Sequence, residues 1–206
     1  MGHDVFRLGL HHKEDTKEQE KIRKELEKIR KALDVIDSSV ITENLWGERW
    51  AKLCQNCMGN PVVAMSNLGT AELAGDEVCR KLQINLAREA TEIGEKLGLD
   101  FDKFGGASKD MWLQSDDKDI YLELDTMIKK RSNGPNRRPS MGQDIHRGRK
   151  TEILHMSGHV LAEARALKID LPYTKKTMET VIQIDSGIIQ PNLDNVYKII
   201  NSLDNN

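Results

Sequence analysis

The spacing of apolar residues is the feature that most constrains the fold of this chain. Beyond Glu43, apolar residues recur mainly at intervals of three and four, the periodicity of helices with one buried face. The clearest run follows Asp76, which can cap a helix N-terminus, and precedes Gly98, which can end a helix. We therefore predict a mainly α fold whose central helix buries Leu82, Leu86, Ala90, Ile93 and Leu97.

The N-terminal segment follows a different pattern. Residues 5–10 alternate apolar and non-apolar side chains, which predicts a half-buried strand, and residues 14–33 predict a charged helix with one narrow apolar stripe. The β-branched run at residues 38–42 predicts a second strand. Because an isolated two-stranded sheet has unpaired edges and little buried area, we expect this unit to be the remnant of a larger sheet. The predicted domains are residues 1–42 and 43–206.

Prolines and polar clusters predict the remaining helix boundaries. Pro61 is expected to end or kink its helix at Asn60. Pro191 suits the first position of the last helix. Further helices are predicted at residues 117–131, 140–147, 151–167, 174–184 and 191–203.

Composition narrows the function classes. The 206 residues carry a net charge of -2, so no overall field attracts nucleic acid or anionic membranes. No apolar run approaches the roughly 20 residues of a bilayer span, and residues 1–10 lack the pattern of a signal peptide. We expect a cytoplasmic protein with no membrane or nucleic-acid partner. A nucleic-acid-binding alternative depends only on the basic loop at residues 129–138, which has no interleaved aromatic residues.

Two pairs of residues in the chain have spacings that also occur in metal sites. Cys54 and Cys57 form a CxxC, but on a predicted helix without a second pair. His155 and His159 are four residues apart, but Met156, Ser157 and Gly158 between them provide no catalytic glutamate. We predict reduced thiols and no metal site.

One polar stripe is expected on an otherwise apolar helix. Lys52, Asn56 and Asn60 are spaced by four residues, so they lie on one helix face. Buried carboxamides need hydrogen-bond partners, and a ligand could provide them. Alternatively, the lysine is solvated and the two asparagines cap or bond locally.

A second polar group lies at two predicted helix starts. Ser140 and Gln143 have the spacing of a capping box, and Glu152 is placed in a first helical turn, where the helix dipole favours an acid. Alternatively, the Ser140 hydroxyl and the Glu152 carboxylate converge on a ligand at these loop–helix junctions.

Both polar groups, in this order and at this separation, resemble motifs of a known family. Trp50-Ala51-Lys52-Leu53 with Asn56 and Asn60-Pro61, then Pro139-Ser140-Met141 with Gln143-Asp144, Gly148-Arg149 and Thr151-Glu152-Ile153, resemble the C-terminal domain of ketopantoate reductases, also called 2-dehydropantoate 2-reductases. The resemblance implies a helical C-terminal domain of the 6-phosphogluconate-dehydrogenase-like type. It also implies that the N-terminal strand–helix–strand unit is the last part of a Rossmann domain.

The resemblance implies a role for each residue. Lys52 would be the general acid that protonates the substrate carbonyl. Asn56 and Asn60 would hydrogen-bond the substrate, Ser140 would meet its carboxylate, and Glu152 would orient a substrate hydroxyl and help to bind the cofactor. The implied reaction is the NADPH-dependent reduction of a 2-oxo acid, most simply 2-dehydropantoate to pantoate in pantothenate biosynthesis, in a homodimer.

The sequence also departs from the family pattern. After Ile153 the chain continues Leu154-His155-Met156, which leaves the substrate open, and the next polar site residue could be Asn67 or Thr70. No GxGxxG follows a strand, so we expect the chain to be inactive unless a Rossmann domain is provided in trans. The alternative is a non-catalytic binding or oligomerisation module derived from the family.

Overall fold

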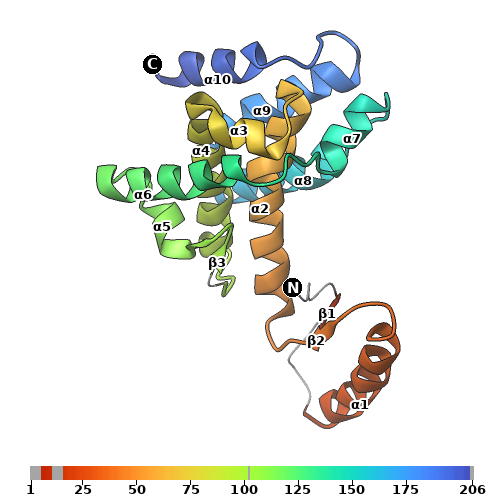
Figure 1. Cartoon of the computed structure of the whole chain (residues 1–206). Helices are drawn as coiled ribbons and strands as arrows, with labels where there is room; N and C mark the ends of the chain where they lie inside the picture. The colour runs from red at the N-terminus through yellow and green to blue at the C-terminus, as the bar shows by residue number, and fades with distance from the viewer. Residues whose placement is uncertain (1–5, 11–15, 102, 205–206) are drawn as a thin grey trace. The chain divides into compact units, whose positions relative to one another are not determined.

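The computed structural model describes residues 6–10, 16–101 and 103–204, and they are mainly helical, as predicted (Figure 1). The predictions for Val5, Glu14 and Asp15 lie outside the described residues. The elements are β1 (Phe6–Leu8), α1 (Thr16–Leu33), β2 (Ser39–Ile41), α2 (Leu45–Ser66), α3 (Thr70–Gly75), α4 (Glu77–Lys96), β3 (Lys103–Phe104), β4 (Ala107–Ser108), α5 (Lys109–Leu113), α6 (Lys118–Lys129), the 3-10 helix η1 (Lys130–Asn133), α7 (Ser140–His146), α8 (Ile153–Leu167), α9 (Pro172–Asp185) and α10 (Asp194–Asp204).

The chain forms two compact units. The first comprises residues 1–50 with 99–101, and the second comprises residues 51–98 with 102–206. In the first unit, β1 and β2 pair in parallel, with Phe6 opposite Ser39, and α1 connects them. The predicted strand–helix–strand unit is therefore present, with a small parallel sheet.

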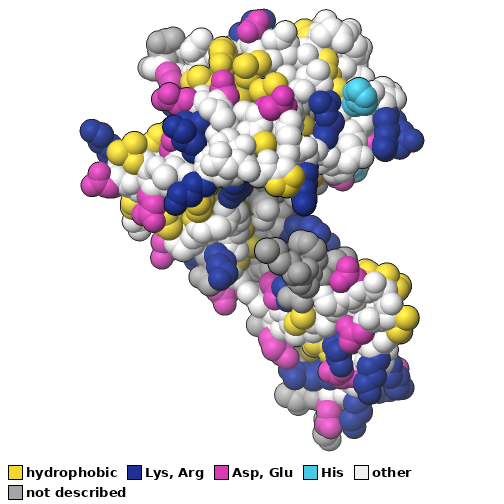
Figure 2. All heavy atoms as spheres, in the orientation of Figure 1, with side chains coloured by type: hydrophobic (Ala, Val, Ile, Leu, Met, Phe, Trp, Pro, Cys, Tyr) yellow, Lys and Arg dark blue, Asp and Glu magenta, His cyan; other side chains and the backbone are white. Residues whose placement is uncertain are grey.

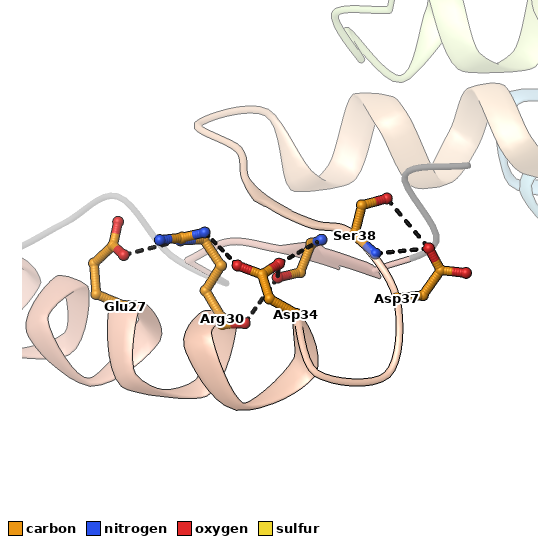
Figure 3. Close-up of polar contacts among 6 residues, drawn as sticks. Glu27, Arg30, Asp34, Asp37 and Ser38 are labelled. Atoms are coloured by element: carbon orange, nitrogen blue, oxygen red, sulfur yellow. Dashed lines mark hydrogen bonds and ion pairs between the residues drawn. The ribbon is translucent and has the colours of Figure 1, made fainter. Parts of the chain in front are cut away.

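The end of α1 is tied to the start of β2 by a polar network (Figure 3). Arg30 donates to Glu27 at 2.9 Å and to Asp34 at 2.6 Å. Asp34 also accepts hydrogen bonds from the Ser39 backbone N–H at 2.9 Å and from the Ser39 hydroxyl at 2.5 Å. Lysines, arginines and acids are interspersed over the exposed surface of α1 (Figure 2). The helix therefore has a solvated outer face, as its sequence predicts.

Helix α4 is the centre of the second unit, as predicted. It contacts α3, α5, α6, α8, α9 and α10. Asp76 caps its N-terminus by accepting the Cys79 N–H at 2.8 Å. Gly98, with φ of 69°, follows its C-cap, where the left-handed conformation favours glycine. The buried positions of α4 include Leu82, Ile84, Leu86, Ala87, Ala90 and Ile93. The prediction that Leu97 is buried is wrong, because Leu97 is the C-cap residue and is exposed.

Two buried polar side chains of α4 hold neighbouring helices. Glu89 accepts the backbone N–H groups of Tyr173 at 3.0 Å and Thr174 at 2.6 Å, at the start of α9. Arg80 donates to Asp125 of α6 at 2.6 Å and to the carbonyls of Ala74 and Gly75 at the end of α3, both at 3.1 Å. Because both are almost fully buried, these bonds fix how α3, α6 and α9 pack against α4.

Two helix boundaries differ from those expected at the prolines. Helix α2 does not end at Asn60 but runs through Pro61 to Ser66, although the proline leaves the Cys57 carbonyl without its usual donor. Helix α10 begins at Asp194, not at Pro191. Asn192 N–H instead donates to the Met65 carbonyl at 2.8 Å, so residues before α10 are bonded to the end of α2. In both places tertiary packing outweighs the local preference of proline.

Candidate functional site

The polar stripe on α2 is present, and part of it lines a pocket. Lys52, Asn56 and Asn60 lie on one continuous helix, with Lys52 exposed and both asparagines half-buried. Asn56 and Asn60 line a pocket of about 160 Å³. Its other walls come from α3, α4, α6, η1 and the segment before α7. The complete lining is Gln55, Asn56, Met58, Gly59, Asn60, Val63, Thr70, Leu73, Ala74, Gln83, Ile128, Arg131 and Pro139.

The chemistry of this pocket is mixed. One part of its lining is apolar and the other presents carboxamides, a hydroxyl and a guanidinium. Ligand sites of small organic molecules have this composition, with a few polar groups placed in an apolar surface. The pocket can therefore hold a small molecule that has an apolar part and several hydrogen-bonding groups.

Ser140 and Glu152 are brought together near the starts of α7 and α8. The Ser140 hydroxyl donates to Glu152 Oε1 at 3.4 Å, and both side chains are exposed. The capping-box interpretation is wrong, because Ser140 is the first residue of α7 and Pro139 is its N-cap. Gln143 donates instead to the Arg138 carbonyl at 2.8 Å. Glu152 is the N-cap of α8, one residue before its first turn, and makes no side-chain capping bond.

The two polar groups do not share the pocket in this structure. Its lining includes Asn56 and Asn60, but not Lys52, Ser140 or Glu152. The nearest link is Pro139, which lines the pocket and directly precedes Ser140.

Gly142 sets the distance between α7 and α2. A Cβ atom at Gly142 would lie 2.5 Å from Val63 Cγ1 and 3.0 Å from Arg138 Cγ. Only glycine allows this approach, and Val63 is buried and also lines the pocket. The contact therefore places Ser140, two residues earlier, beside the helix that carries the asparagines.

Gly142→Ala is expected to destabilise the fold. The added methyl group must displace Val63 or α7, which costs roughly 1–3 kcal/mol and outweighs the gain in helix propensity of about 1 kcal/mol. Urea unfolding measures the difference. Gly158→Ala in α8 is the matched control, since its Cβ would make contacts of 3.6 Å or more. Equal free energies of unfolding for the two variants would show that α7 does not depend on the close approach.

The structure distinguishes between Asn67 and Thr70. Asn67, with φ of 62°, is exposed, and its side-chain oxygen and carbonyl accept bonds from Arg138 at 2.8 and 3.2 Å. Thr70 lines the pocket, and its hydroxyl oxygen accepts the Arg137 N–H at 3.0 Å. Of the two, Thr70 is therefore the residue that lines the pocket together with Asn56 and Asn60.

Parts of the basic loop have partners within the protein. Arg138 holds Asn67, and Arg131 donates to the Gly105 carbonyl while also lining the pocket. These two arginines therefore have bonding partners within the protein, although Arg131 is exposed.

Gln83 and Gly59 are among the pocket residues that were not found from the sequence. Gln83 faces the pocket from α4, where it is 7% exposed, and Gly59 lies between the two asparagine turns of α2. The available signals were a polar residue within an apolar helix and a glycine in the middle of a helix. Neither is specific, because both also occur without any functional role.

The three cysteines are buried. Burial raises the pKa of the Cys57 thiol to about 12, and it also raises the pKa of Cys54. Thiols with such pKa values are protonated and unreactive at neutral pH. Among the described residues, no group of three or more histidines, cysteines or acids is arranged to hold a metal ion. Within the same residues, no helix is long and apolar enough to cross a membrane.

Relatives and solved structures share this fold. The 2-dehydropantoate 2-reductase of Pyrococcus horikoshii is 25% identical over 132 residues, which cover 64% of this chain and 38% of that protein. The chain thus spans about two fifths of that relative's length. The structure of a PanE/ApbA family ketopantoate reductase from Ralstonia eutropha JMP134 matches with a TM-score of 0.58 and 22% identity, over 73% of this chain and 45% of that one.

A further similar structure is the ternary structure of D-mandelate dehydrogenase with NADH and anilino(oxo)acetate. Its TM-score is 0.64 at 17% identity, and the match covers 80% of this chain and 49% of that one. The family described as ketopantoate reductase PanE/ApbA C terminal matches residues 44–185, which include both polar groups of the candidate site. From this match over more than half of its length, the chain belongs to the ketopantoate reductase C-terminal family.

Proposed function

We propose that this chain provides the substrate-binding part of a 2-oxo acid reductase, with 2-dehydropantoate as the substrate and pantoate as the product. The supporting observation is that Asn56, Asn60 and Thr70 line one pocket within the family-matched region. Carboxamides and a hydroxyl can pair with the carboxylate, carbonyl and hydroxyl oxygens of such a molecule. Residues 43–206 would form this functional part, and residues 1–42 would be the end of a dinucleotide-binding domain.

The chain's own residues do not fit a dinucleotide. Its first strand is followed by a connection with Gly9 as the single glycine before α1, whereas a pyrophosphate site needs a glycine-rich turn at a helix N-terminus. The proposal therefore requires a nucleotide-binding region that holds NADPH, in cis or in trans. A nicotinamide cofactor in that region would provide the hydride.

The described residues would then bind the substrate and give it the proton. The Lys52 ammonium would give a proton to the oxygen at C2 and stabilise negative charge that develops there. Asn56 and Asn60 would orient the 2-oxo acid, and Ser140 would hold its carboxylate. Glu152, already bonded to Ser140, would orient a substrate hydroxyl and contact the cofactor. These roles require Lys52 and the Ser140–Glu152 pair to meet the substrate at the edge of the pocket, since they do not line it.

A complementation assay tests the proposed function. The full chain is mixed with, or fused to, the nucleotide-binding domain of a homologous reductase, and oxidation of NADPH is followed with 2-dehydropantoate. Substrate-dependent turnover is expected with both parts and not with either part alone. Absence of turnover in the fused and mixed forms would contradict the proposal and favour a non-catalytic module.

A homodimer and a cytoplasmic location are further parts of this proposal. Light scattering, which measures the molar mass in solution, tests whether the chain forms a homodimer.

A further inference from the structure

Gln83 is the least satisfied polar side chain at the pocket. It lies on α4, 7% exposed, among the buried apolar residues of the central helix. Its Oε1 atom is buried and has no hydrogen-bond partner among the described residues. A buried polar atom without a partner destabilises a fold, so such atoms call for an explanation. Since Gln83 also lines the pocket, a ligand can provide the missing partner.

Gly59 creates space in the same pocket. It lies within α2, where glycine is less favourable than any residue except proline. A Cβ atom at Gly59 would have no other heavy atom within 4 Å. The glycine is therefore not required by close packing or, inside a helix, by backbone conformation. What it does provide is room between the turns that carry Asn56 and Asn60.

The size of the pocket limits what this space can hold. Its volume is about 160 Å³. A cavity of roughly 150 Å³ accommodates a group the size of benzene. Met58, Val63 and Ile128 give it apolar walls. The pocket thus fits the branched, largely apolar end of a small molecule.

The unpaired atom of Gln83 selects the polar group at that end. Oε1 is an acceptor, so it requires a donor on the ligand. A ligand ammonium would be repelled by the guanidinium of Arg131, which lines the same pocket. A hydroxyl group donates without carrying charge, and it can pair with a carboxamide in either orientation.

We infer that Gln83 and Gly59 determine substrate specificity: Gly59 opens the pocket to a branched side chain, and the Gln83 carboxamide hydrogen-bonds the hydroxyl at its end. Since 2-dehydropantoate has one hydroxyl group, this bond takes the place of the one proposed for Glu152, which lies outside the pocket and keeps its bond to Ser140. This inference rests on the proposed function and adds to it the two residues that would recognise the branched, hydroxylated end of the acid. Neither residue takes part in the chemical step.

Binding of three acids to the full chain tests this inference without the cofactor. The probes are 2-dehydropantoate, trimethylpyruvate, which has a hydrogen in place of the terminal hydroxyl, and pyruvate, which lacks the branched group. Dissociation constants come from ligand-observed NMR titrations. The wild-type chain is expected to bind 2-dehydropantoate about tenfold more tightly than trimethylpyruvate, the value of one net hydrogen bond.

Gln83→Leu separates a specificity role from a structural one. The variant should bind both branched acids equally, and its midpoint of thermal unfolding should not fall, because it removes a buried group that lacks a partner. Thr91→Val, which removes a buried hydroxyl bonded to the Ala87 carbonyl at 2.6 Å, is the control on α4. It should lower the unfolding midpoint and keep the tenfold preference.

Gly59→Ala tests whether the room beside Gly59 holds the branched group of the ligand. Both Gly59→Ala and Gly158→Ala in α8 should raise the unfolding midpoint. Only Gly59→Ala should weaken the binding of both branched acids several-fold relative to the binding of pyruvate. The inference is wrong if Gln83→Leu retains the preference for the hydroxylated acid, or if Gly59→Ala weakens all three acids equally. If the wild-type chain binds none of the acids, the proposed function fails, and this inference fails with it.

Discussion

Lys52→Ala should lower the turnover of the complemented reductase by about 10³-fold, within the range found for removing a general acid or an oxyanion stabiliser. The ammonium would no longer donate a proton to the C2 oxygen or stabilise its charge. Because Lys52 is exposed, the free energy of unfolding should change by less than about 0.5 kcal/mol. Single-turnover rates and urea unfolding measure the two effects separately.

The matched control for this change is Lys96→Ala, which removes an exposed lysine in the last turn of α4. It should leave turnover unchanged. Turnover of Lys52→Ala at the wild-type rate would assign proton donation to another group. Loss of turnover together with loss of stability would assign Lys52 a structural role.

Arg80→Met should lower the free energy of unfolding by roughly 3–5 kcal/mol, the usual cost of removing one partner of a buried ion pair. The change leaves Asp125 without its cation and the Ala74 and Gly75 carbonyls without their donor. The midpoint of thermal unfolding should fall by about 10 °C. Because Ala74 lines the pocket, binding of 2-oxo acids should weaken as well.

Two further variants make this prediction specific. Arg88→Met removes the ion pair with Asp116, whose side chain is 80% exposed, and should cost less than about 1 kcal/mol. The double change Arg80→Met with Asp125→Leu should be more stable than Arg80→Met alone, because no charge remains buried without a partner. Equal losses for Arg80→Met and Arg88→Met would contradict the structural role of the buried pair.

Helices of this protein could be predicted from sequence wherever one local signal dominated. The periodicity of α4 and the cap at Asp76 agree with the structure, since the apolar face packs on six helices and the carboxylate bonds the first turn. Pro61 and the Ser140 capping box show the opposite case. The packing of α2 sustains the helix through the proline, and Glu152 draws the serine hydroxyl away from its own helix end. Local rules fail where contacts distant in sequence provide more free energy.

The candidate site could be predicted only in part. Spacing alone places Asn56 and Asn60 on one helix face, and the resemblance points to Ser140 and Glu152. Gln83 could not be found this way, because its significance depends on a missing partner that only the folded chain reveals. Likewise, Asn67 and Thr70 are equivalent candidates in the sequence, and only the folded chain places Thr70, and not Asn67, in the lining of the pocket. Which polar groups remain available for a ligand is a property of the tertiary structure.

The most direct test of the central claim is a titration of the isotope-labelled chain with 2-dehydropantoate, followed through the side-chain amide signals in nitrogen–proton correlation spectra. The account predicts saturable shifts of the Asn56 and Asn60 amide signals, and loss of binding in Asn56→Ala. Shifts confined to residues outside the pocket, with the Asn56 and Asn60 amides unmoved at saturation, would contradict it.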